Sequence, residues 1–195
     1  MSGVTPSGTV KEYLTVEPSS LQAEDSVVKE CFTTYNHAEI QTIKPYPKYK
    51  DSGVEWIGAV PEHWEVKRLK CHAKICNGHD HKKVWDENGK YPIIGTGGIF
   101  GRANDYLHPG PSVILGRKGT IDKPQFHESA FWSVDTAYYT DILPNTNPKF
   151  FFYLCSTINF DLYKYGSAVP SMTQEVLNQI ELTAPPLSEQ TAIAT

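Results

Sequence analysis

The sequence predicts an α+β fold, with short strands in the middle of the chain and short helices after them. Glycine and proline number 14 each among 195 residues, which indicates many turns and argues against a helix bundle. Hydrophobic residues make up 39% and charged residues 21%, a balance that allows a packed core and argues against general disorder. The length corresponds to one ordinary domain, or to one domain with an appendage.

The N-terminal part differs in composition from the rest of the chain. Residues 1–44 are predicted to form a loose leader, and a short helix is plausible over residues 20–35 because apolar residues recur there at helical spacing. Pro45 and Pro47 rule out a helix over residues 42–51, so this stretch is predicted to be an extended strap.

The middle of the chain carries the strand signals. Each is a short β-prone or alternating run, and glycine-rich turns separate several of them. The predicted strands cover residues 66–69, 91–94, 112–115 and 137–142.

Helix signals dominate the C-terminal part. Pro148 opens a predicted helix, and Thr173 is the expected N-cap of a second, shorter one. Residues 181–184 are a candidate closing strand. Prolines 185–186 then break the chain, and Ser188 is expected to cap a new helix that the sequence only begins.

Two tryptophans near the strap are predicted to pack rather than to bind a ligand. Burial of the ring is the ordinary role of tryptophan in a small domain. The expected packing group is Trp56, Ile57, Val60, Trp64 and Leu69.

Charge is distributed unevenly along the chain. The net charge is −4, but residues 64–123 carry 11 Lys/Arg against 6 Asp/Glu, while the segments on either side are acidic. A basic middle between acidic ends fits a polyanion-binding face, although chance unevenness explains it about as well.

The sequence suggests neither export nor membrane insertion. Its start lacks a basic stretch followed by an apolar run, and no apolar run approaches the roughly 20 residues of a membrane span. Four cysteines without an export signal are typical of reduced thiols, so we expect a cytoplasmic protein.

No metal site is expected from the Cys/His-rich segment. Its spacing does not match the usual zinc patterns, and four lysines crowd it. The segment contains Cys71, His72, Cys76, His79 and His81.

Enzyme motifs are weak throughout. The glycine-rich run at 95–98 lacks the helix and acidic residue of a nucleotide-binding unit, and Asn147-Pro148-Lys149-Phe150 has lysine where an amino-methyltransferase motif usually has proline. Residues 116–120 lack the upstream glycine of a phosphate loop. We therefore expect no catalytic residues and no cofactor.

A binding surface remains as the main functional hypothesis. Lysine and arginine neutralise phosphates, glycine lets the backbone approach them, and arginine and asparagine can read base edges with two hydrogen bonds. The candidate DNA-binding residues are Lys82, Lys83, Arg102, Asn104, Arg117, Lys118 and Lys123.

Within this set, Arg102, Asn104 and Arg117 are the expected base readers, and the lysines are expected to contact the backbone. A competing interpretation makes Asn104 and Asp105 turn residues and pairs Arg117 with Asp122.

An ordered series of motifs resembles the specificity subunits of Type I restriction–modification enzymes. The resemblance covers about residues 45–195. The segments that carry it are YPKYKDSGVEWIG (46–58), VPEHWEVKRL (60–69), YPIIGTGGI (91–99), VILGRKGTI (113–121), GSAVPSMT (166–173) and PPLSEQ (185–190).

The resemblance implies a non-catalytic target-recognition domain at residues 45–187, with a twisted, partly barrel-like β-sheet and short flanking helices. It implies that the domain reads half of a bipartite double-stranded DNA site and adds Thr96 and Ser167 to the DNA-binding candidates. Residues 188–195 correspond to the truncated start of a long spacer helix. The implied partners are modification subunits that bind S-adenosylmethionine and methylate adenine, and a motor-nuclease restriction subunit.

Two alternatives to DNA recognition remain at this point. One is a DNA-modifying enzyme, a relative of methyltransferases or nucleases. The other is a domain that binds only protein. The missing cofactor loop and the missing carboxylate cluster argue against the enzyme.

Overall fold

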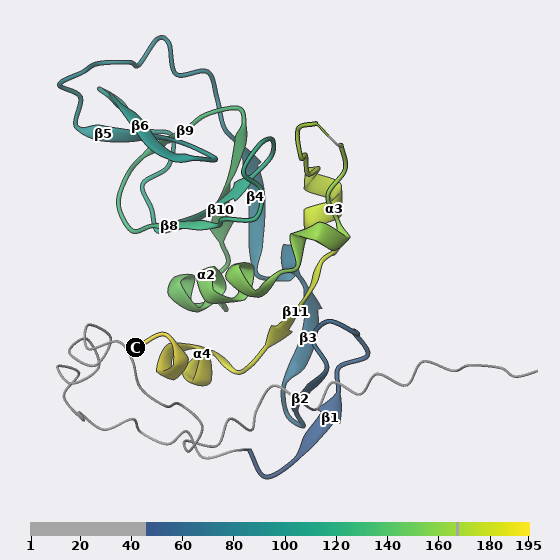
Figure 1. The fold of residues 1–195 in the computed structure, drawn as a ribbon. Coiled ribbons are helices and arrows are strands. Elements are labelled where there is room, and N and C mark those ends of the chain that lie inside the picture. Colours follow the sequence, from purple (N-terminus) through teal and green to yellow (C-terminus); the bar gives the residue numbers. More distant parts are fainter. Residues whose placement is uncertain (1–45, 167) are drawn as a thin grey trace, which may run out of the picture. The chain divides into compact units, whose positions relative to one another are not determined.

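Four small β-sheets and several short helices make up the described part of the chain in the computed structural model, which covers residues 46–166 and 168–195 (Figure 1). The leader, with its possible helix over residues 20–35, lies outside the described residues, as does Ser167. Residues 46–195 form one unit by themselves. The predicted α+β class is therefore confirmed for this unit.

The strands are short, between two and six residues. They are β1 (Tyr49–Asp51), β2 (Ala59–Pro61), β3 (Glu65–Arg68), β4 (Ala73–Asn77), β5 (Tyr91–Gly95), β6 (Gly98–Ala103), β7 (Ser112–Gly116), β8 (Gln125–His127), β9 (Trp132–Ser133), β10 (Ala137–Ile142) and β11 (Glu181–Ala184). The helices are α2 (Pro148–Thr157), α3 (Gln174–Gln179) and α4 (Leu187–Ile193), with 3₁₀ turns η1 (Leu69–Cys71) and η2 (Phe160–Leu162).

The strands pair into separate sheets rather than one. The largest has the order β4-β10-β7-β8, a second has the order β6-β5-β9, and two-stranded pairs join β1 to β2 and β11 to β3. Among the described residues no sheet closes into a barrel, so the expectation of a single twisted sheet is too simple. The ladders are short, and the β5–β6 ladder contains a β-bulge between Ile93 and Ile94.

The main core lies between the four-stranded sheet and the helices α2 and α3. Asn147 begins α2 by accepting hydrogen bonds from the backbone N–H groups of Lys149 and Phe150, and Phe150 and Phe151 then point into the core. Thr173 caps α3 as predicted, accepting from the Val176 N–H. Residues 181–184 form β11, also as predicted.

Two local expectations need correction or refinement. Ser188 does not cap α4, because this helix already begins at Leu187, after Pro186, and makes no side-chain cap hydrogen bond. Val60 and Leu69 are buried and Trp56 packs against the core, as predicted. Trp64 is half-buried and donates its indole N–H to Glu189.

Candidate nucleic-acid interface

The glycine turn between β5 and β6 lies against the loop that follows β7. Gln125 bridges them, because its side-chain amide donates to the carbonyl oxygens of Gly95 (2.9 Å) and Thr96 (3.3 Å). A methyl group at Gly119 would lie 3.6 Å from the Thr96 hydroxyl. The structure therefore brings Thr96 together with the loop at residues 116–120.

Backbone hydrogen bonds fix this loop on both sides. The N–H groups of Arg117 and Lys118 both donate to the Thr136 carbonyl, at 3.0 and 3.1 Å. Gly119 N–H donates to Pro170 (2.9 Å), and Met172 N–H donates to Arg117 (3.0 Å). Gly119 has φ of +87°, a conformation that favours glycine. These hydrogen bonds hold the backbone of the loop in a defined position.

The Arg117 side chain is oriented by neighbours other than Asp122. Its Nη1 donates to the Asp135 carbonyl at 3.2 Å, and its guanidinium lies 5.9 Å from the centre of the Tyr138 ring. Burial raises the pKa of Tyr138, an effect that the Arg117 charge opposes. The ion pairs of the described residues do not include one between Arg117 and Asp122. Arginine has five N–H donors, so several remain for a ligand.

A second group of candidates lies at the other end of the β5–β6 hairpin. Arg102 pairs with Pro92 in the ladder and is separated from the turn by roughly 10 Å of strand. The segment after Lys83 runs beside it, because Asp86 N–H donates to Arg102 and Asn104 N–H donates to Val84, both at 3.0 Å.

The predicted residues thus form two sets. We call Thr96, Arg117, Lys118 and Lys123 the turn–loop surface, and Lys82, Lys83, Arg102 and Asn104 the hairpin flank. Within residues 46–166 and 168–195, none of their cations takes part in an ion pair. The Arg102 guanidinium donates to the Lys90 carbonyl at 3.2 Å, which fixes its direction on β6.

Sequence reasoning missed three exposed apolar side chains in and beside the same hairpin, Trp85, Ile99 and Phe100, with exposed fractions of 43%, 60% and 51%. Phe100 lies beside Trp85, with 6.3 Å between ring centres, whereas Ile99 lines a groove together with Pro92 and Arg102. The sequence contained one signal for this exposure, because Ile99 and Phe100 stand between Gly98 and Gly101. Two large apolar residues bracketed by turn glycines have little reason to be in a core.

The Cys/His-rich segment does not assemble a metal site. Cys71 is exposed, His72 is buried and Cys76 is half-buried. Among the described residues, no group of three or more His, Cys, Asp or Glu side chains could hold a metal ion.

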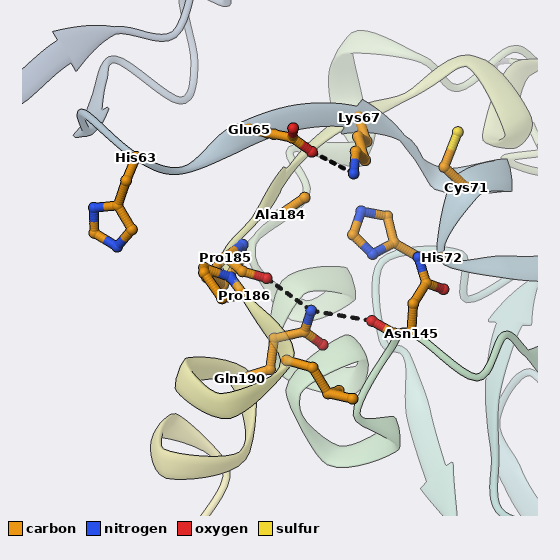
Figure 2. Close-up of a pocket in the computed structure, with 11 residues that line it drawn as sticks. His63, Glu65, Lys67, Cys71, His72, Asn145, Ala184, Pro185, Pro186 and Gln190 are labelled. Atoms are coloured by element: carbon orange, nitrogen blue, oxygen red, sulfur yellow. Dashed lines mark hydrogen bonds and ion pairs between the residues drawn. The ribbon is translucent and has the colours of Figure 1, made fainter.

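A cavity of about 330 Å³ lies beside His72, between β3 and the entry to α4 (Figure 2). Burial, with a smaller effect of Lys67, lowers the pKa of His72 to about 4. Its Nδ1 lies 3.5 Å from the Thr146 hydroxyl, and its Nε2 lacks a partner within the described structure. The facing Lys67 is paired with Glu65, and Gln190 donates to Asn145 and Pro185. The polar side chains that line this cavity therefore connect β3 and the segment around Asn145 to the start of α4, which is a structural role.

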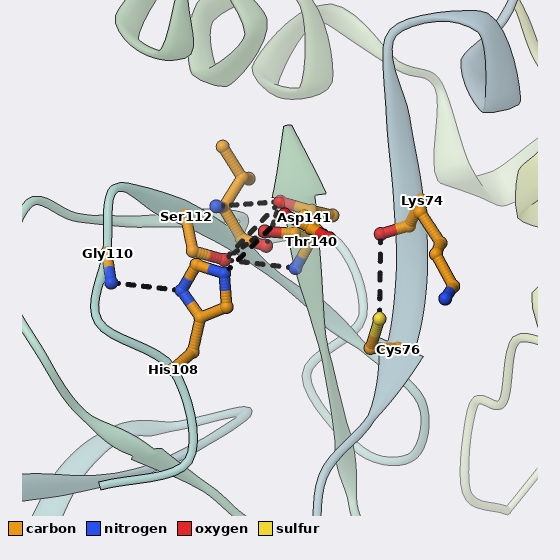
Figure 3. Close-up of polar contacts among 8 residues, drawn as sticks. Lys74, Cys76, His108, Gly110, Ser112, Thr140 and Asp141 are labelled. Atoms are coloured by element: carbon orange, nitrogen blue, oxygen red, sulfur yellow. Dashed lines mark hydrogen bonds and ion pairs between the residues drawn. The ribbon is translucent and has the colours of Figure 1, made fainter. Parts of the chain in front are cut away.

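One constellation superficially suggests hydrolytic chemistry, since Ser112, His108 and Asp141 lie close together (Figure 3). Ser112 is buried and donates to the Thr140 carbonyl at 2.7 Å. His108 accepts from the Gly110 N–H through Nδ1, while its Nε2 lies 3.9 Å from Asp141. No hydrogen bond joins His108 to Ser112, whose hydroxyl bonds to Thr140 instead, and a nucleophile needs a base within hydrogen-bond reach. The cluster ties β7 to β10.

No helix in the described part of the chain is long and apolar enough to cross a membrane.

Comparison with known proteins identifies similar chains. The family model described as "Type I restriction modification DNA specificity domain" matches residues 61–195. A curated relative, the Type I restriction enzyme EcoprrI specificity subunit of Escherichia coli, is 26% identical over 131 residues, which cover 67% of this chain and 32% of the relative.

Two solved structures share the fold. The S subunit of a Type-I restriction-modification system from M. genitalium has a TM-score of 0.60 at 16% identity, covering 68% of this chain and 37% of that chain. A chain from work on complex assembly and conformational transition of the type I R-M system has a TM-score of 0.59 at 15% identity, covering 75% and 39%. The match to the curated relative covers about a third of that protein's length.

Proposed function

The chain belongs to the family of Type I restriction modification DNA specificity domains, and we propose that it recognises one half of a bipartite site in double-stranded DNA. The observation that carries this proposal is the pair of surfaces at the two ends of the β5–β6 hairpin, formed with the neighbouring segments. They present arginine and lysine side chains outside the ion pairs of the described structure, beside a glycine turn that permits close approach.

The two surfaces are proposed to divide the work of recognition. In the turn–loop surface, Arg117 reads a base edge, because Asp135 and Tyr138 hold its planar guanidinium in place. Lys118 and Lys123 neutralise phosphates. In the hairpin flank, Arg102 and Asn104 are the proposed base readers, and Lys82 and Lys83 contact the backbone. Thr96 and Ser167 complete the proposed set.

The chain itself is proposed to be non-catalytic and to act through partners. These are modification subunits that bind S-adenosylmethionine and methylate adenine, and a restriction subunit that cleaves; all would work in the cytoplasm. We propose residues 45–187 as the target-recognition domain. Residues 188–195, most of α4, are proposed as the start of the spacer helix.

The salt dependence of binding to a labelled duplex tests this proposal. Five cationic side chains at the DNA surface, Lys82, Lys83, Arg117, Lys118 and Lys123, displace counterions from the duplex and predict a slope of log K against log salt of about −4 to −5. An isolated half-site reader is expected to bind weakly, at about 10⁻⁴ to 10⁻⁶ M.

A matched pair of variants makes the test specific. Lys118→Gln should reduce the slope by about one. Lys48→Gln removes another exposed cation, one that pairs with Glu62, and should leave the slope unchanged. Binding that does not respond to salt contradicts the proposal, and saturable binding of S-adenosylmethionine by the isolated chain favours an enzyme instead.

A further inference from the structure

A groove of about 590 Å³ lies on the face of the β5–β6 hairpin that carries Ile99 and Arg102. We propose that this groove holds a stretch of the sugar–phosphate backbone of one DNA strand, with Lys90 as its phosphate contact. The inference rests on the proposed function. It adds a backbone contact that would fix the position of Arg102 relative to the bases.

The charge of the groove points to an anionic ligand. Two of the side chains that line it are cations, Lys90 and Arg102, and none of the lining side chains in the described structure is a carboxylate. Neither cation takes part in an ion pair within residues 46–166 and 168–195. Asp105 lies nearby, and its carboxylate accepts the N–H of Tyr106 at 2.8 Å. A concave wall with charge of one sign attracts ligands of the opposite sign.

Contacts among the lining residues keep the two cations on one wall. The Arg102 guanidinium donates to the Lys90 carbonyl at 3.2 Å, and Lys90 Nζ lies 5.4 Å from the centre of the Tyr91 ring. The Tyr91 ring in turn lies 5.0 Å from the Tyr106 ring, measured between centres. The wall is thus organised before a ligand arrives, which lowers the entropic cost of binding.

The remaining lining residues match the units between the phosphates of a nucleic-acid strand. Beside the cations, Pro92 and Ile99 supply apolar surface, and Tyr106 is 44% exposed. A DNA strand alternates charged phosphates with deoxyribose rings, which present mainly carbon and hydrogen. A groove that combines cations with apolar and aromatic surface is therefore suited to this alternation.

Continuity with the hairpin flank favours DNA over an acidic protein segment. Arg102 belongs both to the hairpin flank and to the groove, and Asn104 follows two residues later. Contacts to phosphates and sugars make up half or more of the hydrogen bonds in protein–DNA interfaces, and they set the register in which bases are read. Base readers at Arg102 and Asn104 therefore require a backbone contact close by, and Lys90 supplies it.

Neutralisation of single phosphates tests the proposal. The preferred duplex is first selected from a random pool with the 195-residue chain at low salt. A methylphosphonate, which lacks the phosphate charge, then replaces each phosphate in turn. At one position or more, wild-type affinity should fall about tenfold, the lower end for a hydrogen bond to a charged group. Lys90→Gln should lose about as much on the unmodified duplex and little more at that position, because the contact is already absent.

Three variants make the assignment specific. Lys90 adds a sixth cation to the five proposed above, so Lys90→Gln should also reduce the salt slope by about one. Lys90→Arg keeps the charge and should keep the methylphosphonate effect. Lys48→Gln removes an exposed lysine of the segment before β1 and should behave as wild type on every duplex. Lys90 is exposed, so its variants should fold, which the melting temperature checks.

The outcomes are distinct. Selective duplex binding by Lys90→Gln with the affinity and salt slope of the wild type overturns the inference and leaves the proposed function intact, and it points to an acidic protein segment as the ligand of the groove. Methylphosphonate losses that are the same in Lys90→Gln and in the wild type at every position also overturn it. Absence of duplex binding by the wild type overturns both proposals.

Discussion

The hairpin end and the α4 end of the described unit differ in how they engage their polar and charged side chains. At the α4 end, the carboxylate of Glu189 accepts hydrogen bonds from Tyr46 (2.9 Å), Trp64 (2.9 Å) and His63 (2.7 Å). Gln190 is buried and bonds to Asn145, Asn147 and Pro185. At the hairpin end, large apolar groups are exposed, and the cations of the hairpin flank have no carboxylate partner in the described structure.

This contrast distinguishes a scaffold from a recognition surface. Satisfied polar groups contribute to stability, whereas exposed apolar surface and unpaired cations contribute little to it and are available to a ligand. Substitutions at the α4 end or in the core should therefore change folding, and those on the hairpin should change binding.

The largest expected effect is on folding stability, when a phenylalanine is replaced by alanine in the core and, for comparison, on the hairpin. Phe151 is fully buried against His72, so Phe151→Ala should lose about 3–5 kcal/mol of unfolding free energy. Phe100→Ala, at a half-exposed position on the hairpin, should lose about 1 kcal/mol or less. Urea denaturation measures both, and equal losses would make the hairpin part of the core.

The next effect concerns pH. Because the pKa of His72 is about 4 in the folded chain and about 6.5 when unfolded, the unfolded state binds the proton first. The contribution of neutral His72 to the free energy of unfolding should be complete above pH 6.5. It should fall by about 3 kcal/mol as the pH drops toward 4. His72→Gln removes this titration and should flatten the profile of unfolding free energy against pH. An unchanged slope in the variant would assign the dependence to His108 and His127, whose pKa values burial also lowers.

Arg117→Ala tests whether the turn–loop surface contributes to sequence-specific DNA affinity. We expect a loss of about 1–3 kcal/mol on the selected half-site and little on a scrambled duplex, with unchanged folding. Fluorescence anisotropy with both duplexes measures the difference. Equal losses on the two duplexes make Arg117 a phosphate contact, and no loss on either makes it a structural residue.

The smallest expected effect is at Glu189. Burial raises the pKa of this carboxyl, but donation by Trp64, His63 and Tyr46 outweighs burial and lowers it. Glu189→Gln removes the charge from these bonds and should cost about 1 kcal/mol of stability without changing DNA affinity. Trp64→Phe removes one donor, and a double-mutant cycle should show coupling between the two sites. A change in DNA affinity would contradict the division between scaffold and surface.

Local features of the fold were predictable from the sequence, and pairings between distant segments were not. Thr173, Pro148 and the strand at 181–184 follow from neighbouring residues, through a cap, a fixed φ and a β-prone run. Glu189 and Trp64 lie 125 positions apart, and no local pattern specifies their contact. The same holds for the division of the strands into separate sheets.

The candidate site shows the same limit. Residue type identified Arg117 and Lys118, because arginine and lysine in glycine-rich loops are suited to DNA. The sequence did not show that Thr96 lies beside Gly119 while Arg102 faces the other end of the hairpin. It also did not show that Trp85 packs beside Phe100, because the two residues come from different segments of the chain.

The most direct test of the account is an amide ¹H–¹⁵N titration of the chain with its selected duplex. The account predicts that the largest shifts occur at residues 96–102 and 117–119, while residues 187–193 of α4 remain unchanged. Shifts concentrated around Glu189 and β3, with the hairpin unaffected, would contradict it.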